Sequence, residues 1–300
     1  MPAPLLVAPA PFKGTLRATE VAAALARGLE AEGWEVDRCP LADGGLGTLE
    51  VLLPALGGET AAVEVGGRAV GIGLVEDGGT AIVELSAVLE TDGADASRAA
   101  PDAGGTTDAD AADEPAAARG SSRAAGELLL AAAQTNAEVL VVGAGDVRCG
   151  DGGEGAVEAI AAGGGIEQPL VVLCDVRTPL DGIAWGATGD GIAAALAQAC
   201  DARLESGAAF VLEQLDGDAR MRAARAVVVG EGLLDLRTLA GKAPGELATR
   251  ARQSGVPCFA VVGGRTLDAF GGRILDLQAV LEASTVDELE LAGRQLATLV

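Results

Sequence analysis

Histidine and tyrosine are missing from this 300-residue chain, and all aromatic residues together make up 2% of it. Without histidine, serine–histidine–aspartate triads, imidazole general bases and most zinc sites are excluded. Because aromatic rings are so few, leucine, valine, isoleucine and alanine must fill the interior. The apolar content of 49% is sufficient for a sizeable core, in one large domain or in two of ordinary size.

Positive charge is also scarce. The formal net charge is −23, which argues against nucleic acids and anionic membranes as partners. The same field repels anionic ligands, so a phosphate or carboxylate site requires local cations or a metal. Arginine occurs nineteen times, but lysine only at Lys13 and Lys242. Each lysine stands in a glycine-containing loop beside an expected strand end or helix start, where its compact ammonium group suits phosphate or carboxylate oxygens. The simpler alternative is two surface lysines without a role.

Targeting signals and metal-binding cysteine motifs are missing as well. The N-terminus has no basic region followed by a long apolar run, and no stretch approaches the roughly 20 apolar residues of a membrane span. The five cysteines lack metal-ligand spacing, so we expect them to be reduced and mostly buried. The sequence therefore favours a soluble, cytoplasmic protein. The cysteines are Cys39, Cys149, Cys174, Cys200 and Cys258.

Both ends of the chain alternate strands with helices. We expect a strand over 5–8, a helix over about 16–30 with Thr15 as its N-cap, a strand over 34–41 and a helix ending near 56. The alternation returns with strands over 226–232, 257–262 and 274–280 and helices ending near 253 and 299. Short connections in this order are typical of a parallel sheet covered on both faces.

The middle of the chain follows another pattern. Three strands over 61–65, 69–75 and 80–85, separated by glycine-rich turns, predict an antiparallel arrangement. Residues 90–120 have almost nothing to bury and predict a flexible surface loop. Strands and helices alternate again over 122–176, and 188–222 are expected to be mainly helical. We therefore predict an α/β fold: a doubly wound parallel-sheet domain from 1–58 and 223–300, and a second, inserted α/β domain from 59–222.

Two glycine-rich loops share one spacing. In the first, Asp43 precedes Gly44, Gly45 and Gly47, and Thr48 opens a helix; the stretch Asp151-Gly-Gly-Glu-Gly155 repeats this order. Such a loop brings backbone N–H groups at a helix start close to an anion and leaves a carboxylate beside them. Taken singly, each loop is also explained as a turn that joins a strand to a helix.

Acidic residues recur where strands end: Asp43, Asp151, Asp175 and Glu231, with Asp235 one turn further on. In open α/β sheets, ligands bind outside the carboxyl ends of the strands, so these side chains could meet in one crevice. Together with lysines and glycine-loop amides they suit Mg²⁺-assisted phosphoryl transfer. The alternative for any one of them is a helix N-cap.

Four motifs, in order, resemble those of the bacterial type I glycerate kinases. They are Pro11-Phe-Lys-Gly-Thr15, Leu41-Ala-Asp-Gly-Gly-Leu-Gly-Thr48, Cys174-Asp-Val-Arg-Thr-Pro-Leu180 and Gly230-Glu-Gly-Leu-Leu-Asp-Leu-Arg-Thr-Leu-Ala-Gly-Lys242. The resemblance covers nearly the whole chain. It implies ATP- and Mg²⁺-dependent phosphorylation of D-glycerate or a similar small hydroxy acid, on a flavodoxin-like α/β domain with ligands bound between it and the second domain. A homodimer is left open.

The resemblance also implies roles. Lys13, Asp43 and Asp151 are expected to be catalytic, the carboxylates through hydroxyl activation or metal binding, with Asp175 as a metal ligand. Substrate and nucleotide binding is expected from Gly44, Gly45, Thr48, Gly152, Gly153, Glu231, Asp235 and Lys242. Leu46 and Leu233 stand where the family has an acidic residue and an arginine, and the middle of the chain is shorter than usual. The loop at Asp151 keeps this aspartate and both following glycines but lacks the Ser, Thr and Asn of the family. This substituted loop and the missing arginine motivate an alternative, a diverged non-catalytic relative that binds a nucleotide or a small acid.

Overall fold

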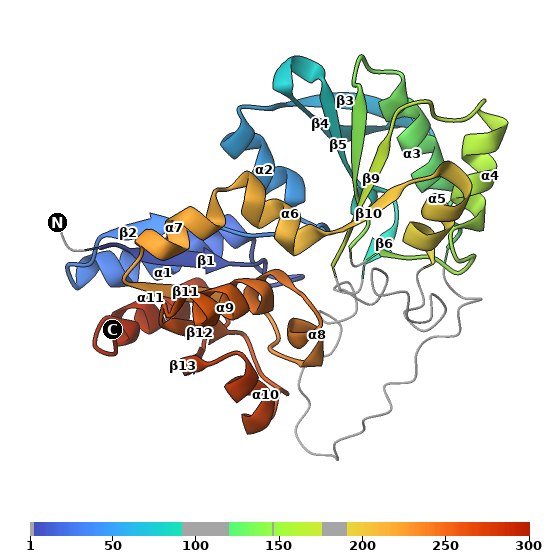
Figure 1. The fold of residues 1–300 in the computed structure, drawn as a ribbon. Helices are drawn as coiled ribbons and strands as arrows, with labels where there is room; N and C mark the ends of the chain where they lie inside the picture. The colour runs from blue at the N-terminus through green and yellow to red at the C-terminus, as the bar shows by residue number, and fades with distance from the viewer. Residues whose placement is uncertain (1–2, 92–119, 146, 176–190) are drawn as a thin grey trace.

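A computed structural model describes residues 3–91, 120–145, 147–175 and 191–300. The loop expected over 90–120 lies outside these residues except for its ends. The described residues form two large sheets, each accompanied by helices, and one small two-stranded sheet. In Figure 1 both ends of the chain lie toward the same end of the first large sheet. No helix within the described ranges is long and apolar enough to cross a bilayer.

The first sheet consists of five parallel strands in the order β13-β12-β11-β1-β2. Numbered along the chain within this sheet, the order is 2-1-3-4-5, which is the flavodoxin-like doubly wound topology. The predicted fold class is thereby confirmed. The strands are Leu5–Pro9 (β1), Val36–Arg38 (β2), Ala226–Glu231 (β11), Cys258–Val262 (β12) and Leu277–Glu282 (β13).

Helices cover both faces of this sheet. Ala18–Ala31 (α1) and Val286–Leu296 (α11) pack together on one face, whereas Ala243–Ser254 (α9) packs on the other. Alternate residues of β1 serve the two faces: Leu5 belongs to the cluster with α1 and α11, and Leu6 to the cluster with α9. Two short helices, Leu236–Leu239 (α8) and Ala269–Ile274 (α10), follow β11 and β12.

The second sheet is mixed. Its order is β10-β9-β7-β5-β4-β3; the strands from β10 to β5 are parallel, and β4 is antiparallel to both of its neighbours. The strands are Glu59–Val65 (β3), Arg68–Val75 (β4), Thr80–Glu84 (β5), Val139–Gly143 (β7), Leu170–Cys174 (β9) and Arg203–Ser206 (β10). The other elements are the 3-10 turns Glu76–Gly78 and Leu85–Ala87, the paired strands Glu90–Thr91 (β6) and Val147–Arg148 (β8), and the helices Arg123–Ala133 (α3), Glu154–Ala162 (α4) and Ile192–Cys200 (α5).

Helices connect the two large sheets. Thr48–Leu56 (α2) and Gly207–Gln214 (α6) lie between them in Figure 1, and Gly217–Ala223 (α7) follows α6 and packs on α9. One buried cluster includes side chains of both sheets, among them Val229 of β11 and Val171 of β9. Although α2 precedes residue 59, it packs on β4 and β5. The division into 1–58 with 223–300 and 59–222 stays a prediction.

Three local expectations differ from the structure. Arg17, not Thr15, precedes the first helix, because the Thr15 hydroxyl donates to the Phe12 carbonyl oxygen at 2.9 Å and closes a turn instead. A short strand, β10, interrupts the stretch expected to be helical, since it pairs in parallel with β9. The last strand begins at Leu277 rather than 274, after the helix α10.

Candidate active site

A cavity of about 320 Å³ opens at the carboxyl ends of the first sheet. Every strand of that sheet supplies lining residues from the segment at or just after its end. They are Ala10, Pro11, Phe12, Lys13 and Thr15 after β1, Asp43 after β2, Glu231, Gly232, Leu233, Asp235, Arg237 and Lys242 at or after β11, Gly263 after β12 and Ser284 after β13. The sheet order reverses between β1 and β11, and crevices at such switch points are where open α/β sheets bind ligands.

A tight turn positions Lys13. The backbone N–H of Leu16 donates to the Phe12 carbonyl oxygen at 3.0 Å, and the Phe12 N–H donates back to the Leu16 carbonyl at 2.9 Å. Phe12 is buried and belongs to the core under α1. Gly14 takes φ +81°, a conformation that favours glycine. The turn therefore fixes the backbone from which the Lys13 side chain reaches the cavity.

Glu231, the last residue of β11, is a carboxylate held inside the protein with a 6% exposed side chain. The Thr238 hydroxyl donates to its Oε1 at 2.7 Å. Burial raises the pKa of Glu231 to about 7; the Thr238 hydrogen bond and the Lys242 charge oppose this, and Asp235 and Asp43 add to it.

Asp235 and Lys242 occupy two helix starts beside Glu231. Asp235 caps α8 by accepting from the backbone N–H groups of Arg237 at 2.8 Å and Thr238 at 3.3 Å. Lys242 is the N-cap residue of α9 and is buried. The segment from β11 to α9 therefore carries two carboxylates and an ammonium group into one wall of the cavity.

An ion pair connects this wall to the second sheet. The Arg237 guanidinium lies 3.1 Å from Oδ2 of Asp175, which follows β9. The Asp175 side chain is 12% exposed and that of Arg237 42% exposed, and of the two only Arg237 is among the described residues that line the cavity.

The first glycine loop crosses between the two sheets. A Cβ at Gly44 would lie 2.7 Å from the Leu173 Cβ, and a Cβ at Gly207 would lie 2.2 Å from the Asp43 carbonyl oxygen. These glycines are required because backbone packs on backbone at this crossing. The side chain of Asp43 is buried, at 3% exposure, and lines the cavity.

The amides at the start of α2 are bound within the protein. The Glu84 carboxylate accepts from the Leu49 N–H at 2.6 Å and from the backbone N–H groups of Gly47 and Thr48. Burial raises the pKa of Glu84, and these hydrogen bonds oppose the increase. The Thr48 hydroxyl donates to the Gly45 carbonyl oxygen at 2.7 Å. Glu84 was missed in the sequence because its partners lie 35 residues away along the chain.

The second glycine loop organises the start of α4. Asp151 accepts from the Ser121 hydroxyl at 2.7 Å and from the N–H groups of Ser122 at 2.8 Å and Gly153 at 3.1 Å. Burial alone would raise the pKa of Asp151, but these hydrogen bonds outweigh it and lower the pKa to about 2. The described residues that line the cavity do not include Asp151, Gly152 or Gly153.

Comparison with known proteins shows which protein family this chain belongs to. The sequence matches the glycerate kinase family over residues 5–164 and 175–288. The chain belongs to the glycerate kinase family. It is 27% identical to a glycerate kinase of Bacillus subtilis (strain 168) and 26% identical to a glycerate 2-kinase of Escherichia coli (strain K12), in each case over 88% of this chain and 86% of the relative.

A solved structure shares the fold of this family member. It is a crystal structure described as glycerate kinase 2 from Salmonella typhimurium LT2, with a TM-score of 0.69 and 24% identity over 100% of this chain and 98% of that one. Glycerate kinases are phosphotransferases that act on a hydroxyl group, so the predicted enzyme class, a glycerate kinase-like phosphotransferase with an alcohol acceptor, is confirmed.

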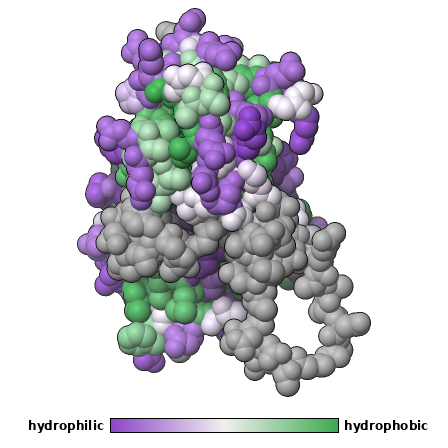
Figure 2. Space-filling model, turned by 90° about the vertical axis from the view of Figure 1, so that its right-hand side faces the viewer, coloured by the Kyte–Doolittle hydropathy of each residue, from purple (hydrophilic) through white to green (hydrophobic). Residues whose placement is uncertain are grey.

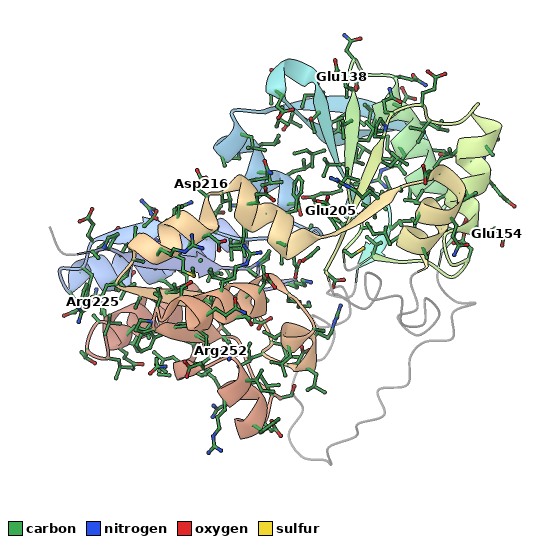
Figure 3. All side chains as sticks on the ribbon, in the orientation of Figure 1. Glu138, Glu154, Glu205, Asp216, Arg225 and Arg252 are labelled. Carbon is green, nitrogen blue, oxygen red and sulfur yellow. The ribbon has the colours of Figure 1, made fainter. Side chains whose placement is uncertain are left out.

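The cavity of this glycerate kinase family member brings together six charged groups. Lys13, Arg237 and Lys242 face the same space as Asp43, Glu231 and Asp235. The chain's two lysines thus meet in one cavity, whereas charged residues such as Glu138, Glu154 and Asp216, labelled in Figure 3, are exposed. In the described ranges, no three His, Cys, Asp or Glu residues are grouped to hold a metal.

Apolar side chains reach solvent beside the cavity. Leu233 lines it and is 47% exposed, and Leu46, at the first glycine loop, is 42% exposed. Figure 2 shows apolar surface on the lower part of the face it presents, which belongs to the unit of the first sheet. The cavity therefore has charged groups together with an apolar wall.

Proposed function

We propose that this protein is an ATP- and Mg²⁺-dependent kinase that transfers the γ-phosphoryl group to a hydroxyl of D-glycerate or a similar small hydroxy acid, and that it is a diverged, shortened type I member of its family. The proposal is supported most by one observation. Both lysines of a lysine-poor, acidic chain line a single cavity at the switch point of the sheet, beside three carboxylates.

The cations are proposed to bind the anionic parts of the two substrates. Lys13 and Lys242 approach the cavity from β1 and from the start of α9, so they can contact two different anionic groups. A lysine ammonium stabilises charge that develops on a transferring phosphoryl group. Asp43, Glu231 and Asp235 line the same cavity and are proposed to orient or deprotonate a substrate hydroxyl.

Asp175 is proposed to hold the Mg²⁺ that accompanies ATP. Magnesium in kinases is bound through one or two protein carboxylates while phosphates and water complete its coordination, and a partly buried carboxylate after β9 fits that donor set. When bound, the ion supplies charge neutralisation on the phosphates. Arg237, which holds Asp175 at 3.1 Å, would exchange this partner for an anionic substrate.

The glycine loops are proposed to act mainly by holding the backbone that carries Asp43 and Asp151 in place. Gly44, Gly45 and Thr48 fix the backbone on which Asp43 stands, because Thr48 bonds to Gly45 and Gly44 packs on Leu173. Asp151 is proposed to shape the loop with Gly152 and Gly153 through its hydrogen bonds with Ser121, Ser122 and Gly153. A cytoplasmic location is also proposed, and it is supported by five cysteines that are all free.

The direct test is a coupled assay of ADP release. Purified protein with Mg²⁺-ATP is expected to release ADP when D-glycerate or another small 2-hydroxy or 3-hydroxy acid is added, and not with amino acids of the same length as controls. The alternative, a non-catalytic binder, is motivated by the exposed Leu46 and Leu233. It would be favoured if calorimetry detects ATP or hydroxy-acid binding while no acid in the panel gives ADP release.

A further inference from the structure

The hydrogen-bonding direction around Glu231 is fixed by its neighbours. The Thr238 hydroxyl has one proton and two partners: it accepts from the Asp235 backbone N–H at 3.2 Å and donates to Glu231 Oε1 at 2.7 Å. Its proton therefore points at Glu231. Oε1 is held as an acceptor, so a proton gained or lost by this carboxylate is carried by Oε2.

The position of Glu231 makes that oxygen relevant to the substrate. Glu231 ends β11, the strand beside the switch point, and lines the same cavity as Lys13, Lys242 and Asp43. Its side chain is almost fully withdrawn from bulk water, at 6% exposure. A buried carboxylate with one oxygen fixed and the other able to take a proton is arranged as a general base.

We propose that Glu231 is the catalytic base of the phosphoryl transfer, with Thr238 as the residue that positions it. This inference rests on the proposed function. In the step, the O–H bond of the substrate hydroxyl breaks and its proton passes to Glu231 Oε2. The hydroxyl oxygen's electron pair forms the bond to the γ-phosphorus. The bond from that phosphorus to the β,γ-bridging oxygen breaks, and its electron pair leaves with ADP.

The charges around Glu231 suit that task. Burial raises its pKa to about 7, close to the pH at which such a group can both accept and release a proton. Lys242 and the Thr238 hydroxyl favour the ionised form, and Asp235 and Asp43 disfavour it. Lys13 and Arg237 line the same cavity and add positive charge. Asp151 is a poorer base, since its pKa is lowered to about 2.

Two variants test the assignment. Glu231→Gln keeps an oxygen acceptor for Thr238 but cannot take the proton, so kcat is expected to fall by about 100- to 10,000-fold while the KM values for ATP and the hydroxy acid change little. Thr238→Val removes one hydrogen bond that favours the ionised form. The rise of kcat/KM with pH, expected near pH 7 in the parent, should then move upward by about one pH unit.

Matched controls separate this role from a structural one. Thr238→Ser restores the hydroxyl and should return the parent's pH profile. Thr249→Val removes a hydroxyl that donates to the Gly245 carbonyl oxygen in α9, outside the cavity, and should leave the profile unchanged. If the parent is active and Glu231→Gln keeps its rate, the inference about Glu231 is wrong, while the proposed function stands. The same holds if the parent is active and Thr238→Val keeps the parent's pH profile. A parent inactive with every hydroxy acid overturns the proposed function and this inference together.

Discussion

At the scale of the residue, Glu231 is a buried carboxylate whose ionisation opposes folding. The folded protein binds its proton more tightly than the unfolded chain does, because burial raises the pKa from 4.5 to about 7. The free energy of unfolding of the parent should therefore fall as the pH rises through this interval, relative to a variant that cannot ionise. A group retained at such a cost in stability is typical of a functional site.

The difference in free energy of unfolding between Glu231→Gln and the parent should therefore shift in favour of the variant as the pH rises. Between pH 4.5 and pH 8 this shift is expected to be about 3 kcal/mol. The sign follows from the raised pKa: glutamine remains neutral throughout, whereas the parent must ionise a buried group above pH 7. Urea unfolding of both proteins at pH 4.5 and pH 8 measures the difference. A stability difference that is the same at both pH values would show that Glu231 ionises as readily in the folded protein as in the unfolded chain.

At the scale of the element, α2 is fixed to the second sheet by the Glu84 carboxylate. Three N–H groups at the start of this helix have no partner four residues earlier, and a carboxylate at the end of β5 accepts from them. Negative charge at a helix N-terminus is also favourable because of the helix dipole. This contact holds the loop of Asp43 between the two sheets.

Glu84→Ala should lower the free energy of unfolding by about 1–3 kcal/mol, because the partly buried N–H groups of Gly47 and Leu49 lose this acceptor. Glu84→Gln keeps an oxygen at the same place and is expected to lose less. Urea unfolding at pH 8 compares the three proteins, with Glu158→Gln, which changes an exposed carboxylate of α4, as the control. Equal stability of parent and Glu84→Ala would mean that water replaces the carboxylate at no cost.

Most elements and the residue types of the site could be predicted from the sequence, but the contacts between the site residues could not. Hydrophobic periodicity and glycine punctuation located most strands and helices, and strand-end position singled out Lys13, Asp43 and Glu231, which line one cavity. The pattern could not show that Glu84 binds the helix amides, that Asp175 pairs with Arg237, or that Gly44 packs on Leu173. Each of these contacts joins segments far apart in the chain, and spacing within one segment carries no information about such pairs.

At the scale of the whole molecule, two sheets share one buried cluster and the cavity lies at one end of the first sheet. The molecule carries a net charge of −23, yet the six charged groups named around the cavity are three cations and three anions. The negative field of the whole protein repels an anionic substrate, so a cavity in which positive and negative charges balance is needed to bind one. The lysines matter most here, because they are the chain's only ammonium side chains and both reach this cavity.

The central claim is that phosphoryl transfer takes place in this cavity. The most direct test is the rate of ADP release at saturating Mg²⁺-ATP and D-glycerate, for the parent, Lys13→Ala and Asp43→Asn. Loss of a group that stabilises the transition state costs roughly 3–4 kcal/mol, so each variant is expected to be about 100- to 1000-fold slower. The control Thr249→Val, outside the cavity, should match the parent. Variants as fast as the parent would contradict the claim.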